Sequence, residues 1–598
     1  MPTKKEHQLR RTARYGAALA LLGTLVLAGC GGGGADSGAN AQPPGTQPPG
    51  TQPPITQPPV TQPPGTSPAP TVSLSAAPTT VAAGGSTLLT WSSSNASGCA
   101  ATVGWSGAKA TSGNQTINPV SATSTYTLTC TGSGGSTTRS VTVNVTAAIG
   151  VSGAVDSSLR DRHQESANLV FAFAGSNTTT GTPAATAPVM QDAGACTFRY
   201  DLAGLAAGNY TVALTSDGGT TFKRTANVTV AGAGVVQNFA PARVLQVGPT
   251  RQLTHPSQVT GLRSGDVVEI DAGVYNGPAI TWSTSNLTLR GVGGRAHMVA
   301  PASISNGKAI WVAAGTNIAV ENMEFSGAAV PDLNGSGVRG DGQDLAICGS
   351  YFHDNQEGFL GGGGRLLIEY SEFARNGNCD DPSGCAHNIY VDNIARFTLR
   401  HSYSHHARVG HTVKSRAQEN YILYNRIMDE ADGTSSYTID LPNGGLTYVI
   451  GNLLQQGPLT DNPTILTYGE EGLTNTNRNL YVVNNTFVND RGSGAFVSLV
   501  TGVTATLQNN LFVGGGTVVS GGTVTQVTNR TTNTPNFVNA GAFDYRPTAG
   551  TPGINGGTAP GVGGTFDLTP LYQYVHPTNR EPRPLNGVID IGAYELTP

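Results

Sequence analysis

The ionisable side chains of this 598-residue chain gather in one stretch of the sequence. Charged residues make up only 12% of the chain, yet six of its eleven histidines lie in this stretch: His353, His387, His401, His405, His406 and His411. Acidic and basic residues accompany them: Asp354, Glu357, Asp380, Asp381, Arg408, Lys414, Arg416, Asp429, Glu430, Asp432 and Asp440. Cations, imidazoles and carboxylates at this density can bind an anion and transfer protons. We therefore expect a functional site here rather than an ordinary solvated face.

The elements that position these residues are indicated by an internal repeat. A block of one polar, one variable and one apolar residue recurs every 21 to 33 residues. The blocks are Met323–Phe325, Ser350–Phe352, Ser371–Phe373, Ser402–Ser404, Asn425–Ile427, Asn452–Leu454, Asn485–Phe487 and Asn510–Phe512. Short strands with stacked Ser or Asn at this period are typical of a parallel β-helix, whose coils bury a core only by stacking.

The repeat also predicts which side chains share a face. Counting back 11 or 12 residues from three successive blocks reaches Tyr390, Lys414 and Asp440. If Val413 points inward, strand alternation turns Lys414 and Arg416 outward. We therefore expect Tyr390, Lys414 and Asp440 to stand about 4.8 Å apart on three adjacent coils.

The ladder and the ending Asp590–Glu595 resemble right-handed parallel β-helix proteins of the polysaccharide lyase type. The segment Val413–Asn425 is similar to the Asn-Lys-Ser segment of chondroitinase B and alginate lyases of that fold. The resemblance implies β-elimination of an acidic, uronate-containing polysaccharide, with Lys414 as the base. In that family an arginine on the following coil acts as the general acid. The corresponding segment here, Tyr437–Gly445, contains no arginine, so the identity of the general acid is left open.

Elimination requires groups that neutralise the sugar carboxylate, remove the C5 proton and protonate or stabilise the departing O4. Asp440 beside Lys414 would favour the charged ammonium, so Tyr390, His387 or His411 are alternative proton carriers or partners of the leaving oxygen. We expect substrate to be bound by Arg408, Arg416, His405, His406, Asp440 and Asn443.

Metal ions and other functions are alternatives. The acidic loop with Asp429, Glu430 and Asp432 could bind Ca²⁺, whereas no tight His-x₃-His pattern points to zinc. A glycoside hydrolase using Asp429 and Asp440 is a second possibility. A surface adhesin or exopolysaccharide-binding scaffold without catalysis is a third.

The first 70 residues predict export and anchoring. Basic residues precede an apolar stretch that closes on Leu27–Cys30, which resembles a bacterial lipoprotein signal (residues 1–30) with Cys30 as the lipidated residue. Gly31 favours the outer membrane, on its periplasmic or outer face. Residues 31–70 are a Gly-rich and then Pro-rich spacer, with a Gln-Pro-Pro-x-Thr repeat that favours an extended chain. The membrane would be reached only through the lipid.

Composition and cysteines complete the prediction. The chain has 80 Gly and a formal net charge of −4, with no basic stripe for nucleic acid. Alternating strands predict a β-sandwich over 71–147, which resembles bacterial immunoglobulin-like modules, and a second sandwich over 148–242. The fold class is thus all-β, with a right-handed parallel β-helix over 243–598. We expect disulfides between Cys99 and Cys130 and between Cys379 and Cys385, with Cys196 and Cys348 unpaired.

Overall fold

The computed structural model describes residues 67–596 apart from 83–84, 103–104, 121, 147–148, 232–233, 381–383 and 585–586. The signal, Cys30 and nearly all of the spacer lie outside these residues, so anchoring stays a prediction. None of the helices within the described ranges is long and apolar enough to cross a membrane. These helices are single 3-10 turns, namely η1 (Ser157–Leu159), η2 (Glu165–Ala167), η3 (Pro256–Gln258) and η4 (Ala540–Ala542).

The first module is a sandwich of two sheets, whose strands pair antiparallel except for β2, which pairs in parallel with β8. One sheet contains β1 (Thr71–Ala77), β3 (Gly85–Ser94) and β6 (Ser112–Val120). The other contains β2 (Thr80–Ala82), β8 (Gly135–Thr146), β7 (Ser124–Gly132), β4 (Gly98–Thr102) and β5 (Gly107–Lys109). Cys99 and Cys130 are directly opposite on β4 and β7 and form the predicted disulfide. The bridge therefore joins neighbouring strands of one sheet.

The second module is likewise built from two sheets, and here each sheet has four strands. The first contains β11 (Ala185–Pro188), β10 (Leu169–Ala174), β14 (Gly208–Thr215) and β15 (Phe222–Val230). The second contains β12 (Met190–Gln191), β13 (Phe198–Ala203), β9 (Gly150–Val155) and β16 (Val235–Val236). Alternate residues of these strands, such as Val151, Val170 and Val212, fill a shared core. The sequence pattern of apolar and polar alternation is thus explained by burial of one face of each sheet.

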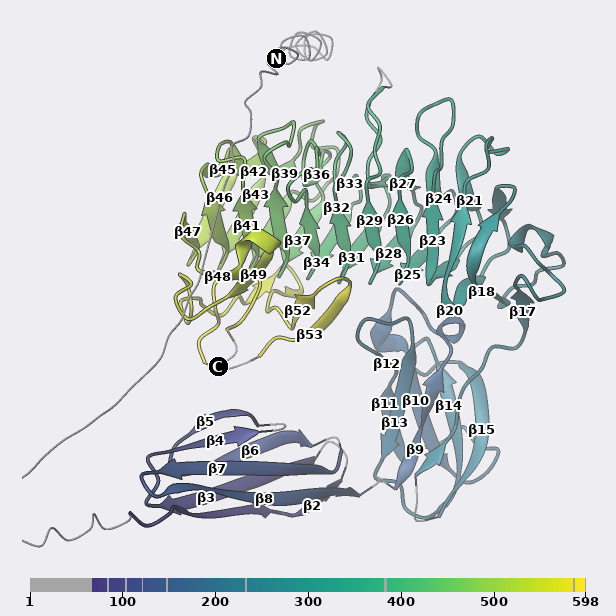
Figure 1. The fold of residues 1–598 in the computed structure, drawn as a ribbon. Helices are drawn as coiled ribbons and strands as arrows, with labels where there is room; N and C mark the ends of the chain where they lie inside the picture. Colours follow the sequence, from purple (N-terminus) through teal and green to yellow (C-terminus); the bar gives the residue numbers. More distant parts are fainter. Residues whose placement is uncertain are drawn as a thin grey trace, which may run out of the picture. The chain divides into compact units, whose positions relative to one another are not determined.

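The remainder is a parallel β-helix in which each coil supplies three strands (Figure 1). The first face contains β17 (Val244–Val247), β18 (Val267–Asn276), β20 (Thr288–Val299), β22 (Ala319–Glu321), β25 (Leu345–Cys348), β28 (Arg365–Glu369), β31 (Arg396–Arg400), β34 (Glu419–Leu423), β37 (Leu446–Ile450), β40 (Asn479–Val483), β43 (Thr504–Gln508) and β46 (Thr523–Val527). The predicted fold class is confirmed.

The other two faces are built in the same way. The second face begins at the ends of β18 and β20 and continues through β23 (Met323–Ser326), β26 (Tyr351–His353), β29 (Glu372–Ala374), β32 (Tyr403–His405), β35 (Arg426–Met428), β38 (Leu453–Gln456), β41 (Thr486–Asn489), β44 (Leu511–Gly514) and β47 (Arg530–Thr532). The third face contains β19 (Ile280–Trp282), β21 (Ala309–Ala313), β24 (Ser336–Gly340), β27 (Glu357–Gly361), β30 (Ile389–Val391), β33 (Val413–Ser415), β36 (Ile439–Leu441), β39 (Thr464–Tyr468), β42 (Ala495–Leu499) and β45 (Thr517–Ser520).

The recurring Ser and Asn residues form the ladder that the repeat predicted. Ser350 Oγ accepts a hydrogen bond from the backbone N–H of Met323, one coil earlier. Asn452 Oδ1 likewise accepts from the backbone of Asn425 at 2.8 Å. The chain of contacts runs from coil to coil as far as Asn529. These side chains satisfy backbone groups at the bend between the first and second faces, where no strand partner is present.

Apolar side chains stack in the interior along the same direction. Phe325, Phe352 and Phe373 lie on successive coils and are fully buried, with ring centroids 5.2 and 4.6 Å apart. Because every coil repeats the inward positions, the core is a continuous column. The outward positions between them are free to carry polar side chains.

The parallel coils end at β47, and the segment after it packs against their sides. It contains β48 (Phe537–Asn539), β49 (Asp544–Pro547), β50 (Val562–Gly563), β51 (Phe566–Asp567), β52 (Tyr572–Val575) and β53 (Asn579–Pro582). Asp590–Glu595 belongs to this segment. The backbone oxygen of Asp590 accepts from Asn484 Nδ2, and Glu595 forms a buried ion pair of 3.0 Å with Arg583.

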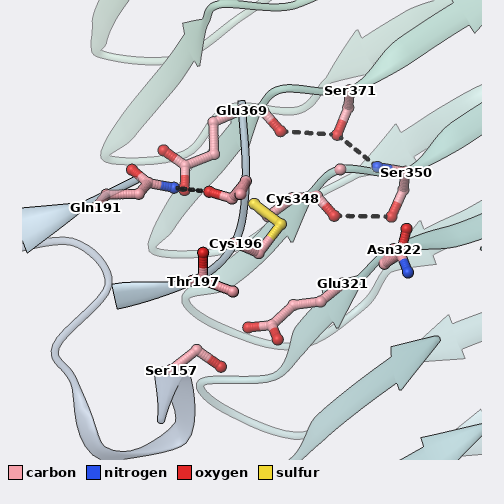
Figure 2. Close-up of a disulfide and its surroundings, with 12 residues drawn as sticks. Ser157, Gln191, Cys196, Thr197, Glu321, Asn322, Cys348, Ser350, Glu369 and Ser371 are labelled. Carbon is pink, nitrogen blue, oxygen red and sulfur yellow. Dashed lines mark hydrogen bonds between the residues drawn. A yellow bond between two sulfur atoms is a disulfide. The ribbon is translucent and has the colours of Figure 1, made fainter. Parts of the chain in front are cut away.

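The expectation that Cys196 and Cys348 are unpaired is wrong, because they form a disulfide (Figure 2). Cys196 follows β12 in the second module, and Cys348 ends β25 on the first face of the β-helix. Gln191 Nε2 also donates to Glu369 Oε1 at 2.7 Å across the same contact. Docking of one module on another created the pairing, which no spacing in the sequence could indicate. Cys379 and Cys385 are joined as expected.

We expect a non-reduced peptide map of the protein to contain the Cys196 and Cys348 peptides as one linked species. The two sulfurs are bonded to each other where the second module contacts the β-helix, so an alkylating reagent should leave both cysteines of the native protein unmodified. Mass spectrometry before and after reduction checks this. Detection of either cysteine as an alkylated peptide in native protein would contradict the pairing.

Candidate functional site

The predicted register of the third face is confirmed. Tyr390 on β30 pairs with Lys414 on β33, and Lys414 pairs with Asp440 on β36. Val413 is fully buried in the core, as expected from strand alternation. Together with Arg416, Glu471, His387 and His411, these residues form what we call the Lys414 cluster.

Lys414 is held between two carboxylates. Its Nζ lies 3.3 Å from Asp440 Oδ2 and 2.8 Å from Glu471 Oε1. Burial alone would lower the pKa of Lys414, but Asp440 and Glu471 outweigh it and the pKa lies above its ordinary value. Lys414 is therefore a fixed positive charge in this structure.

Arg416 lies two residues further along and supplies a second cation. It donates to Glu471 Oε2 at 2.6 Å, to Tyr390 Oη at 2.8 Å and to Asn443 Oδ1 at 2.5 Å. Glu471 thus bridges both cations with its two oxygens. Partial burial raises the pKa of Glu471, but hydrogen bonds from Lys414 and Arg416 bring it below its ordinary value.

The two carboxylates on Lys414 have opposite electrostatic properties. The Asp440 side chain is only 3% exposed, and burial raises its pKa to about 6 against the opposing attraction of Lys414. Within the described residues, Asp440 Oδ1 has no hydrogen-bond partner. The Glu471 side chain is 47% exposed. Glu471 can therefore be exchanged for another anion, whereas Asp440 is part of the permanent framework.

His387 and His411 stack beside the cations with ring centroids 4.6 Å apart. The backbone N–H of His411 donates to His387 Nδ1, and that of Tyr437 donates to His411 Nδ1. Each Nδ1 is therefore an acceptor, and a neutral ring carries its proton on Nε2. Burial, with the nearby Lys414 and Arg416, holds both pKa values well below the ordinary value. Both imidazoles are neutral near pH 7.

The histidine-rich stretch is divided among several places. His353 and His405 lie on the second face, and His406 follows at the next turn. His405 contacts Glu372, and His406 contacts Asp432. His401 is buried and stacks on the rings of Tyr370 and Tyr424. Of the predicted substrate-binding residues, the structure brings Arg416, Asp440 and Asn443 to Lys414.

Arg408 and the predicted calcium loop also lie apart from the cluster. Arg408 pairs with Asp354 after β26. Asp429 is buried, and its carboxylate accepts from Thr460 Oγ1 at 2.9 Å. Asp429, Glu430 and Asp432 do not converge on one point in the described structure. Asp429 is instead a structural acceptor, since burial raises its pKa and neighbouring donors hold it.

Glu471 is the member of the cluster that the sequence did not indicate. It lies in the turn after β39, 57 residues beyond Lys414. The paired acids Glu470 and Glu471 were a faint signal in a chain with so few charges. The counting rule used for Tyr390, Lys414 and Asp440 places strand residues only, and it cannot place a residue in a turn.

Comparison with known proteins adds a likeness of the fold. No protein-family model matches the sequence, and no curated protein matches it. The structure is similar to one reported as the crystal structure of pectate lyase Pel9A, with 14% identity and a TM-score of 0.43. The match covers 60% of this chain and 97% of that chain. The β-helix itself is established by the parallel strand pairing of this chain.

Proposed function

We propose that the protein binds an acidic, uronate-containing polysaccharide at the Lys414 cluster and cleaves it by β-elimination. The observation that supports this is the Glu471 carboxylate, which bridges Lys414 and Arg416 from a half-exposed position. A uronate carboxylate can take the same place, because it offers the same two oxygens to the same two cations. Neutralising that charge makes the neighbouring C5 proton easier to remove.

Roles follow from the hydrogen bonds. A charged Lys414 cannot accept a proton, so it neutralises the substrate carboxylate together with Arg416. Tyr390 is the proton carrier in this proposal, because Arg416 donates to its oxygen and holds that oxygen beside the cations that would bind the substrate carboxylate. Removal of the C5 proton breaks the C4–O bond and forms the C4–C5 double bond. The expelled oxygen then takes a proton from Tyr390 or from water.

The test is a screen of pectate, alginate, glycosaminoglycans and bacterial exopolysaccharides. Elimination produces an unsaturated uronate that absorbs in the near ultraviolet. Absorbance that grows with time on one of these polymers, and that Lys414→Ala abolishes, is the expected result. Binding without any new chain ends would contradict the proposal and support the non-catalytic adhesin.

One observation favours a second candidate, a glycoside hydrolase. Asp440 and Glu471 contact the same ammonium, yet the pKa of Asp440 is raised to about 6 while that of Glu471 is lowered. Carboxyls whose pKa values are separated in this way can divide the roles of acid and base. New reducing ends without the ultraviolet product would select this candidate.

We expect affinity for an acidic oligosaccharide to rise several-fold between pH 7 and pH 5. Asp440 loses its charge as pH falls through about 6, which leaves Lys414 and Arg416 less neutralised. One unit charge 4 Å away is worth about 1 kcal/mol in water, or about fivefold in affinity. Calorimetric titration with an uncleaved oligouronate measures this.

The variant Asp440→Asn should bind tightly at both pH values, with a flattened pH dependence. Burial also raises the pKa of Glu357, so Glu357→Gln is compared as the control for a second titrating carboxyl. If the pH dependence survives in Asp440→Asn and disappears in Glu357→Gln, Glu357 causes the effect and the assignment to Asp440 is wrong.

A further inference from the structure

A second group of polar side chains lies on the second face of the β-helix, outside the Lys414 cluster. His297 on β20 pairs in register with Glu324 on β23, and Ser326 on β23 pairs with His353 on β26. The residues between them, such as Met298 and Phe325, are buried in the core. The three polar side chains consequently point outward on three consecutive coils.

Two imidazole nitrogens converge on one carboxylate oxygen in this group. His297 Nδ1 lies 3.3 Å and His353 Nε2 lies 3.1 Å from Glu324 Oε1. All three ligand atoms lie within 4.8 Å of one another. Ligands about 2.0–2.1 Å from a tetrahedral zinc ion are separated by about 3.3 Å. The spacing of these atoms is therefore close to that of a metal-binding set.

Both histidines are oriented by partners on their other nitrogens. His353 Nδ1 lies 2.9 Å from Asp354 Oδ2, and His297 Nε2 lies 2.8 Å from Ser326 Oγ. Metal-binding histidines usually have such a partner, which fixes the ring and directs the free nitrogen at the ion. Tyr351 stacks on His353 with ring centroids 4.4 Å apart and restrains it further. The ligands are thus held before any ion arrives.

We propose that His297, Glu324 and His353 bind a zinc ion with three protein ligands and one position open to solvent. Two nitrogens and one oxygen suit a borderline ion such as Zn²⁺ and disfavour the hard ions Ca²⁺ and Mg²⁺. The side chains are 16 to 25% exposed, which leaves room for a water or a ligand in the fourth position. This site does not depend on the proposed polysaccharide chemistry, since none of its residues belongs to the Lys414 cluster.

The test is zinc binding by the full chain after removal of metals with a chelator. Titration with ZnCl₂ against a chromophoric chelator should show one tight site that excess CaCl₂ does not compete for. Glu324→Gln and His353→Gln should each weaken binding at least 100-fold. Asp354→Asn should weaken it about 10- to 100-fold, as expected for a partner that orients a ligand. His255→Gln, which alters a histidine elsewhere, should leave it unchanged.

A second measurement needs no variant. Cobalt(II) bound to the wild-type protein should show the intense visible bands of a four- or five-coordinate site. The pale spectrum of six-coordinate cobalt, the absence of a stoichiometric site, or binding that persists in both Glu324→Gln and His353→Gln would overturn the proposal. In that case the three side chains are held by hydrogen bonds alone.

Discussion

Replacing Lys414 with alanine should lower the rate of polymer cleavage about 10²- to 10⁴-fold. A positioned group that acts on the transferred proton or on the developing charge contributes an effect of that size. The ammonium is the centre of the cluster, because Asp440 and Glu471 both contact it. The measurement is the initial rate of ultraviolet absorbance on the polymer found by the screen.

A conservative variant separates the two roles of Lys414. Lys414→Arg keeps a positive charge and should retain more activity than Lys414→Ala if the residue neutralises the carboxylate. It should be as inactive as alanine if Lys414 is the base. Lys308→Ala is the matched control, since Lys308 is an exposed lysine that pairs with Asp341 elsewhere on the rod. A folded Lys414→Ala protein with near-full activity would refute the assignment.

Replacing Asn452 with alanine should lower the free energy of unfolding by roughly 3 to 5 kcal/mol. Asn452 is fully buried and contacts both neighbouring coils. Its loss deprives the backbone N–H of Asn425 of its acceptor and the carbonyl of Ile422 of one donor. Each such buried group costs about 1–3 kcal/mol, and the missing side chain leaves a small cavity in addition.

Urea unfolding followed by circular dichroism measures this loss. Asn393→Ala is the control, because Asn393 is exposed and accepts one hydrogen bond from Gln418. Its effect should stay within about 0.5 kcal/mol. Equal unfolding midpoints for the two variants would show that the ladder fills space without supporting the coils.

The repeat alone was sufficient to predict the β-helix, its Ser and Asn ladder and the column of Tyr390, Lys414 and Asp440. These features depend on pairing between consecutive coils, and each coil restates the same inward and outward positions. Strand alternation then turns Lys414 outward once Val413 is assigned to the core. Periodic contacts of this kind can be counted along the chain.

Contacts between turns and between modules were decided by the tertiary structure. Glu471 reaches Lys414 from a turn whose path has no period, and Cys196 meets Cys348 only because one module docks on another. The turns also place His387 and His411 next to the strands of the third face, whereas His353 and His405 lie on the second face. His297, Glu324 and His353 come together because they lie on three consecutive coils, and the lengths of those coils set their spacing in the sequence, which matches no local metal-binding motif. The length and path of each turn set these contacts, and strand alternation carries no information about either.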